Sequence, residues 1–110
     1  MAIATAPAIG PMFDSAGLSE IDIPVLVIWV GRDEILDEPA NSQFYLDVIP
    51  GAAEYAMPEV GHFTFPSECP DMLRNLAPTI CADPPDVNRA AAHHEMESEI
   101  LIFLNRHVGG

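Results

Sequence analysis

The sequence contains no lysine, and this absence sets the first limit on what the chain can bind. Its four basic residues are arginines, against 17 acids, and the formal net charge at pH 7 is −13. A field of that sign repels the phosphates of nucleic acids and of anionic membranes. We therefore expect neither nucleic acid nor a membrane surface as a partner.

Long apolar runs are also missing. No stretch reaches the roughly 20 apolar residues that a membrane-spanning helix needs. The N-terminal residues lack the basic region and the apolar core of a secretory signal peptide. At 110 residues and 49% hydrophobic content, the chain has material for one domain at most, with a modest core.

Cysteine is scarce, with Cys69 and Cys81 as the only pair. Their spacing does not fit the Cys-x-x-Cys motifs of zinc or redox sites, and no second pair completes a metal site. Two alternatives stay open: a disulfide formed in an oxidising compartment, or two reduced and buried thiols. A bridged pair favours a secreted or periplasmic location, and a reduced pair favours the cytoplasm.

The most informative stretch is residues 23–62, which predicts a strand, an acid, a helix, a strand and a histidine in that order. Val25–Val30 is an unbroken apolar run typical of a buried parallel strand, and Asp33 follows it after Gly31. A short helix then presents Phe44, Tyr45, Val48 and Ile49 on one face. A second strand, Ala52–Met57, leads through a turn to His62.

This order of elements predicts that Asp33 and His62 meet. Parallel strands joined by a crossover helix bring their carboxyl ends to the same edge of the sheet, where open α/β sheets place their chemistry. A histidine that takes a proton from a weak nucleophile needs a partner that fixes its tautomer and stabilises the imidazolium. A carboxylate at the end of the neighbouring strand can do both.

The flanking segments predict an α/β fold. Ala2–Ala8 is expected to form a short strand that ends at Pro7. Residues 63–86 are punctuated by prolines and are expected to form a loop excursion with one short helix, Asp71–Leu76. Asn88 is a plausible N-cap for a final amphipathic helix that ends near Val108.

Several motifs occur in a fixed order along the chain: Ala6-Pro7-Ala8 with Gly10-Pro11-Met12-Phe13-Asp14, then Ile49-Pro50-Gly51-Ala52, Gly61-His62-Phe63 followed by Glu68-Cys69, and Cys81-Ala82-Asp83-Pro84-Pro85. Together with the order of strand, acid, helix, strand and histidine, they resemble the C-terminal part of the α/β-hydrolase fold and, more closely, bacterial predicted dienelactone hydrolases related to platelet-activating-factor acetylhydrolase. The resemblance implies a single partial domain over residues 1–110: about three parallel strands with a crossover helix and a closing C-terminal helix.

The resemblance implies that His62 is the general base of a catalytic triad and that Asp33 orients it. The family has two residues between the glycine after the strand and the acid, whereas only Arg32 stands between Gly31 and Asp33, so Asp37 is an alternative acid. The family's Gly-x-Ser-x-Gly nucleophile motif is absent. Ser15 in Phe13–Gly17 is interpreted as a loop serine.

The resemblance therefore implies the C-terminal fragment of a serine hydrolase, inactive alone, which acts in the complete enzyme on a small ester or lactone. The missing N-terminal half would be its partner, and no metal or organic cofactor is implied. An alternative is a non-catalytic truncated or split-gene product, a small acidic domain that dimerises through an exposed strand edge. A cation-binding acidic module ranks last because its acids are scattered.

The pair His93-His94 invites comparison with zinc helices. The metalloprotease pattern needs a further histidine where Ser98 stands, so it is not met. We expect both histidines to be surface residues of the final helix.

Overall fold

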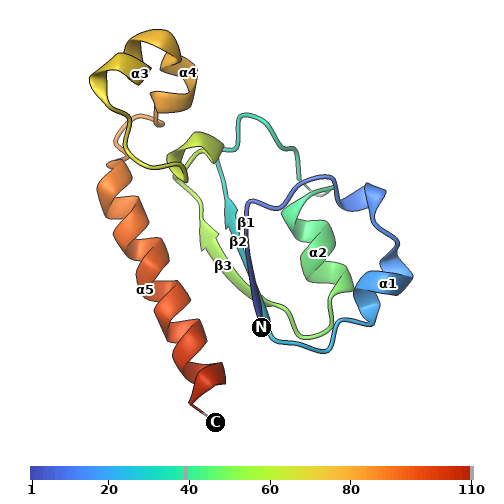
Figure 1. The fold of residues 1–110 in the computed structure, drawn as a ribbon. Coiled ribbons are helices and arrows are strands. Elements are labelled where there is room, and N and C mark those ends of the chain that lie inside the picture. The colour runs from blue at the N-terminus through green and yellow to red at the C-terminus, as the bar shows by residue number, and fades with distance from the viewer. Residues whose placement is uncertain (39, 110) are drawn as a thin grey trace.

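The fold is a three-stranded parallel sheet with helices on both faces (Figure 1). A computed structural model describes residues 1–38 and 40–109. The strands are β1 (Ala2–Thr5), β2 (Val25–Val30) and β3 (Ala53–Met57), in the order β1-β2-β3. Since every pairing is parallel, the three carboxyl ends share one edge of the sheet. This confirms the α/β class expected from the sequence.

The helices divide between the two faces. The long helix α5 (Arg89–Val108) packs on one face, and α1 (Ser15–Ser19) and α2 (Ser42–Val48) lie on the other (Figure 1). The remaining helical segments are the short turns η1 (Gly10–Met12), η2 (His62–Thr64), α3 (Asp71–Leu76) and α4 (Pro78–Cys81). The helix α2 is thus the crossover between β2 and β3.

Strand β2 is the centre of the core because its side chains alternate between the two faces. One set packs toward α5 with Phe103, and the other packs toward Ile49 at the end of α2. Val27 and Ile28, one from each set, are fully buried, which stabilises the fold by about 1.5–3 kcal/mol per side chain. The α5 set is Leu26, Ile28 and Val30, and the α2 set is Val25 and Val27.

Most expected elements are confirmed, and the deviations have local causes. Strand β1 ends at Thr5 instead of Pro7 because Ala6 turns out of the strand with a φ of 43°. Asn88 caps α5 as expected, since its side chain accepts a hydrogen bond from the N–H of Ala91. Ser15 is the exposed first residue of α1, which corrects the expected loop.

Residues 66–86, here called the disulfide lobe, extend beyond the carboxyl edge of the sheet and carry α3 and α4 (Figure 1). The radius of gyration is 15.1 Å, above the roughly 13 Å expected for a compact domain of this size. Figure 1 shows the lobe protruding beyond the sheet and the long α5 running beside the sheet. The lobe covers all but the first three residues of the proline-rich excursion predicted over residues 63–86. The expected helix Asp71–Leu76 is present as α3, and α4 is a second short helix that was not expected.

Both outer edges of the sheet lack a neighbouring strand within the described residues. Strands β1 and β3 each pair only with β2. Unpaired backbone groups along such edges are available for further strand pairing. Among the described helices, none combines the length and the apolar character needed to cross a membrane.

Candidate functional site

Asp33 and His62 lie side by side at the carboxyl edge of the sheet. Asp33 follows β2, His62 follows β3, and the N–H of Gly31 donates to the carbonyl of Met57, so the two strands stay paired up to the site. Asp33 Oδ2 is 2.9 Å from His62 Nδ1. Their side chains are 10% and 28% exposed, so the pair is shielded while the imidazole remains accessible.

The carboxylate of Asp33 is fixed from both sides. Its Oδ1 accepts hydrogen bonds from the N–H groups of Ile35 at 2.8 Å and Leu36 at 2.7 Å. Its Oδ2 faces the imidazole of His62. An ionised carboxylate can only accept, so a hydrogen bond here requires the proton on Nδ1, and this tautomer leaves Nε2 as the basic nitrogen of the ring.

Glu34, the residue after Asp33, contacts the same histidine: its side chain accepts a hydrogen bond from the backbone of His62. The N–H of His62 donates to Glu34 Oε2 at 2.7 Å. Gly61 makes room for this contact, since a Cβ atom there would lie 2.6 Å from Glu34 Oε1. Adjacent acids therefore hold the ring and the main chain of His62, a role for Glu34 that the sequence analysis did not identify.

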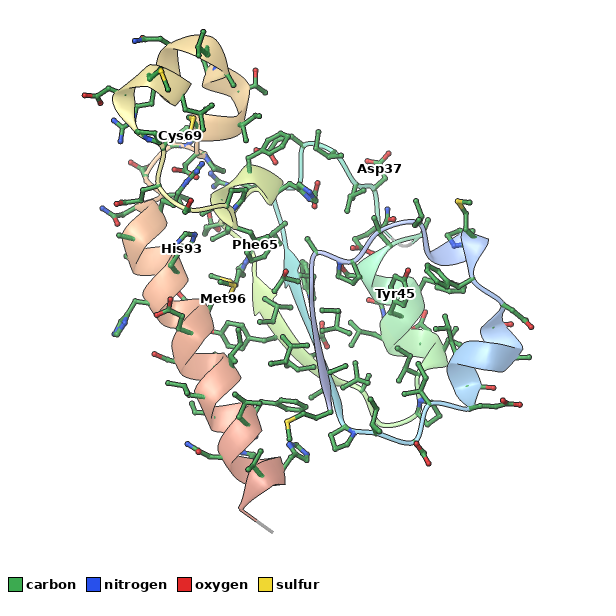
Figure 2. All side chains as sticks on the ribbon, in the orientation of Figure 1. Asp37, Tyr45, Phe65, Cys69, His93 and Met96 are labelled. Atoms are coloured by element: carbon green, nitrogen blue, oxygen red, sulfur yellow. A yellow bond between two sulfur atoms is a disulfide. The ribbon has the colours of Figure 1, made fainter. Side chains whose placement is uncertain are left out.

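Asp37, the alternative acid, lies further along the loop between β2 and α2, closer in the chain to α2 than Asp33 is (Figure 2). Its carbonyl oxygen accepts a hydrogen bond from the side chain of Asn41 at 2.7 Å. The structure thus brings Asp33, and not Asp37, into hydrogen-bond contact with His62. Although only Arg32 separates Gly31 from Asp33, Asp33 still lies at the carboxyl edge of the sheet beside His62.

The turn that carries His62 is anchored from its other end. Thr64 donates its hydroxyl to Asp83 Oδ1 at 2.8 Å, and its carbonyl oxygen lies 2.7 Å from His93 Nε2. Figure 2 shows His93 on the sheet side of α5, above Met96. His93 is half-buried while His94 is exposed, so the expectation that both are surface residues is wrong for His93.

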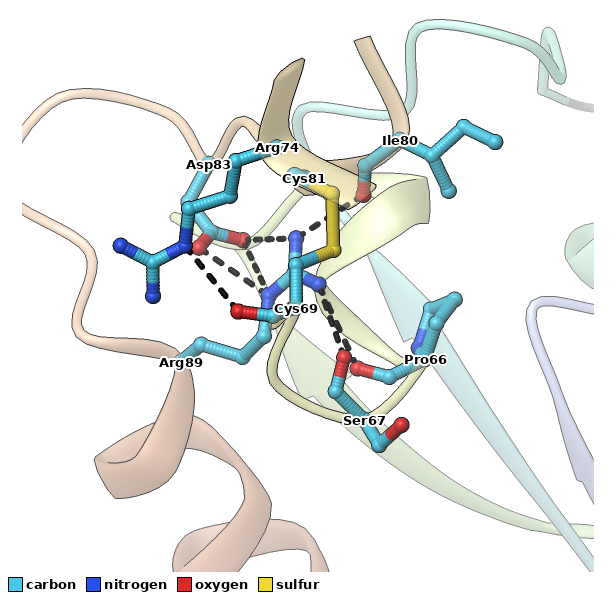
Figure 3. The surroundings of a disulfide bond; sticks show 8 residues. All are labelled: Pro66, Ser67, Cys69, Arg74, Ile80, Cys81, Asp83 and Arg89. Carbon is cyan, nitrogen blue, oxygen red and sulfur yellow. Dashed lines mark hydrogen bonds and ion pairs between the residues drawn. A yellow bond between two sulfur atoms is a disulfide. The ribbon is translucent and has the colours of Figure 1, made fainter. Parts of the chain in front are cut away.

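Arg89 fastens the disulfide lobe to the start of α5. The guanidinium contacts both oxygens of Asp83 at 3.1 to 3.2 Å, and Arg89 is only 6% exposed. It also donates to the carbonyl oxygens of Pro66, Ser67 and Ile80 (Figure 3). Asp83 therefore links this cluster to Thr64, two residues beyond His62.

Cys69 and Cys81 form a disulfide that closes the lobe, with their Cα atoms 5.7 Å apart (Figure 3). Of the two alternatives that the sequence left open, the structure contains the bridged one. Arg74 adds to the closure by donating to the carbonyl oxygen of Cys69 at 3.1 Å.

A pocket of about 530 Å³ adjoins His62, within the usual size range of small-molecule sites. One side comes from the end of β1 and the following loop, and the other comes from η2 and the disulfide lobe. Within residues 1–38 and 40–109, no cluster of three or more His, Cys, Asp or Glu side chains is arranged to hold a metal ion. The arrangement offers a base beside an open pocket.

Comparison of the chain with protein-family models, with curated proteins and with solved structures found no match.

Proposed function

We propose that this chain carries the acid and the histidine of a serine α/β-hydrolase catalytic triad, and that the nucleophilic serine comes from residues outside it. The observation that supports the proposal is the Asp33–His62 pair at 2.9 Å. The two residues follow adjacent parallel strands in the order acid then histidine, as in the family that the sequence resembles. The complete enzyme would hydrolyse esters or lactones.

In the proposed reaction, Nε2 of His62 removes the proton from the serine hydroxyl as the serine attacks the acyl carbon. The imidazolium then passes that proton to the leaving alcohol. Asp33 keeps the first proton on Nδ1 and stabilises the imidazolium without becoming protonated. Backbone N–H groups outside this chain would bind the oxyanion.

The tautomer of His62 tests the dyad in the chain as it stands. Nitrogen-15 NMR of the imidazole should show a protonated Nδ1 and an unprotonated Nε2. Asp33→Asn offers an amide that can donate to Nδ1, so the proton should move to Nε2. Asp37→Asn is the matched control and should leave the tautomer unchanged. A wild-type ring protonated on Nε2 would count against the proposal.

Activity gives the second test. The isolated chain should not hydrolyse a p-nitrophenyl ester, and His62-dependent turnover would mean that it contains its own nucleophile. The DNA upstream of the Met1 codon should continue the reading frame and encode a Gly-x-Ser-x-Gly motif. In the longer product, His62→Ala and Asp33→Asn should each lower kcat by roughly 10³-fold or more, whereas Asp37→Asn should not.

A second candidate is a non-catalytic product that associates through its sheet. The two open edges, at β1 and β3, favour it. Such a chain would pair with a copy of itself or with a separately made N-terminal half. Size-exclusion chromatography distinguishes the cases, since a monomer at all concentrations argues against self-pairing. The disulfide supports an oxidising compartment, secreted or periplasmic, for either candidate.

A further inference from the structure

Most of the residues that line the pocket beside His62 have nonpolar side chains. Apart from Thr5 and His62, every residue that faces it is nonpolar, with Ala6 and Ala8 on the β1 side and Phe65 and Ile80 on the lobe side. An apolar group that enters it gains about 25 cal/mol for each Å² removed from water. The lining therefore favours hydrocarbon over polar substituents.

The wall after β1 is held in a strained conformation. Ala6 and Ile9 have φ values of 43° and 54°, a left-handed backbone that costs roughly 1–2 kcal/mol for a residue other than glycine. Side chains from the α2 side lock it: Asn41 Oδ1 accepts from the N–H of Ile9 at 2.8 Å, and Tyr45 donates to the carbonyl oxygen of Ala8 at 2.6 Å. The wall is therefore formed before any ligand binds.

The opposite wall is fixed by the disulfide lobe. Ile80 precedes Cys81 of the disulfide, and its carbonyl oxygen accepts a hydrogen bond from Arg89 at 3.1 Å. Figure 3 shows the Ile80 side chain pointing away from the disulfide and the Arg89 cluster. The backbone of Ile80 is therefore held in place by the hydrogen bond from Arg89. Its side chain, 40% exposed, lines the pocket.

The charges around the pocket disfavour anionic groups of a substrate relative to neutral ones. No arginine lines the pocket, so a carboxylate or phosphate on the substrate would find no cationic partner there. Asp33 and Glu34 contact His62 directly, and the chain as a whole carries a formal charge of −13. An anionic group would lose hydration and meet a repulsive field.

We propose that this pocket binds an uncharged, apolar part of the substrate and disfavours a substituent that bears a carboxylate or phosphate. This inference rests on the proposed hydrolase function. The pocket itself is a property of the described chain, so binding can be measured without a nucleophile.

The test uses two stable amides that share an anilide and a short chain: neutral butyranilide, whose chain ends in a methyl group, and anionic N-phenylsuccinamic acid, whose chain ends in a carboxylate. Methyl-labelled NMR should show the Ile80 signals shifting on addition of butyranilide, with the anion binding about tenfold or more weakly. Ile80→Arg, followed through the methyl signals of Ala6 and Ala8 because the Ile80 signal is lost, should reverse this preference by supplying a cation. Ile102→Arg is the matched control, because Ile102 on α5 is 41% exposed and lies outside the pocket, and it should change neither affinity.

Three results would overturn the inference: no shift at Ile80 up to the solubility limit of butyranilide, equal or tighter binding of the anion by the wild-type chain, or an unchanged preference in Ile80→Arg. The His62 tautomer keeps this failure separate from failure of the hydrolase proposal. If butyranilide does not bind selectively but Nδ1 of His62 is protonated, the pocket inference fails and the proposed Asp33–His62 dyad is retained. If butyranilide binds selectively but Nε2 of His62 is protonated, the proposed dyad fails and the pocket is retained as a binding site for apolar groups.

Discussion

The backbone N–H of His62 donates a 2.7 Å hydrogen bond to the carboxylate of Glu34. This bond fixes the main chain at the start of η2, while Asp33 fixes the ring. The orientation of the imidazole therefore depends on two neighbouring acids that act at different atoms.

Replacement of Glu34 should loosen the His62 turn. Glu34→Ala removes the acceptor and should lower the free energy of unfolding by about 1 kcal/mol, with faster amide exchange at His62. Glu34→Gln keeps an oxygen acceptor and should retain most of the protection. Glu59→Ala, which removes an exposed partner of Arg32, is the control for loss of surface charge. Equal exchange rates in Glu34→Ala and the wild type would show that the bond does not order the turn.

Gly31 should be intolerant of a side chain. A Cβ atom there would lie 2.3 Å from the carbonyl oxygen of Pro58 and 2.7 Å from its Cα, and backbone cannot move aside as a flexible side chain can. Gly31→Ala should destabilise the fold by about 2 kcal/mol or more in urea unfolding. Gly17→Ala, where nothing lies within 4 Å, should be neutral or stabilise helix α1 by up to about 1 kcal/mol.

Arg89 should be the arginine on which stability depends most. Arg89→Ala leaves the carboxylate of Asp83 without its buried partner and should cost about 3 kcal/mol or more in thermal or urea unfolding. Arg89→Lys cannot reproduce the several donors of the guanidinium and should recover only part of that loss. Arg106→Ala, at an exposed position of α5, should stay within about 0.5 kcal/mol of the wild type.

Reduction of the disulfide should destabilise the lobe. The bridge joins residues that are 12 apart in the chain, and the chain-entropy relation gives about 3 kcal/mol for a loop of that length. A Cys69→Ser, Cys81→Ser double variant should lose that stability in urea unfolding. Addition of a thiol reductant should weaken the wild type alone, because the variant has no bond to break. Equal sensitivity of both proteins would contradict the prediction.

Alkaline pH should weaken the contact between β3 and α5. Tyr55 donates its hydroxyl to Glu95 at 2.8 Å, and this bond, followed by burial and the charges of Glu95 and Glu99, raises the pKa of Tyr55 from 10.0 to about 12. Since the unfolded chain releases this proton first, the contribution to stability is complete below pH 10 and is lost as pH rises toward 12.

The pKa itself can be read from the Tyr55 ring signals in an NMR titration. Glu95→Gln should lower the pKa of Tyr55 toward its ordinary value, because the charge that opposes ionisation is gone. Glu97→Gln, an exposed change on the same helix, should have little effect on it. A Tyr55 titration unaffected by Glu95→Gln would show that burial and the charge of Glu99 set the shift.

The elements predicted well from the sequence are those with a single physical interpretation. Six consecutive apolar residues, Val25–Val30, can only be buried on both faces, and they form the central strand. Asn88 before a helical periodicity marked the start of α5 to the residue. The meeting of Asp33 and His62 followed from the topology of parallel strands, which requires no knowledge of side-chain packing.

What the sequence did not predict depends on contacts between distant segments. The bond from His62 to Glu34 joins the loop after β2 to the turn after β3. The Arg89–Asp83 cluster joins α5 to the disulfide lobe, and the half-buried His93 joins α5 to η2. The loop with left-handed residues at Ala6 and Ile9 is held by hydrogen bonds from Tyr45 to Ala8 and from Ile9 to Asn41, so no local sequence pattern predicts it. Such positions carry no periodicity, and a single sequence has no other signal for them.

The uniform strand direction has a consequence for how the chain reaches this state. Ala2 pairs with Val25, and Leu26 pairs with Ala53, so no two strands are linked by a tight hairpin that could form first. Two strands can pair only after the chain segment that connects them has become compact. The entropic cost of closing that long loop raises the folding barrier and slows folding. Refolding should therefore be slow for a chain of this size, and the half-assembled sheet is the species most exposed to aggregation.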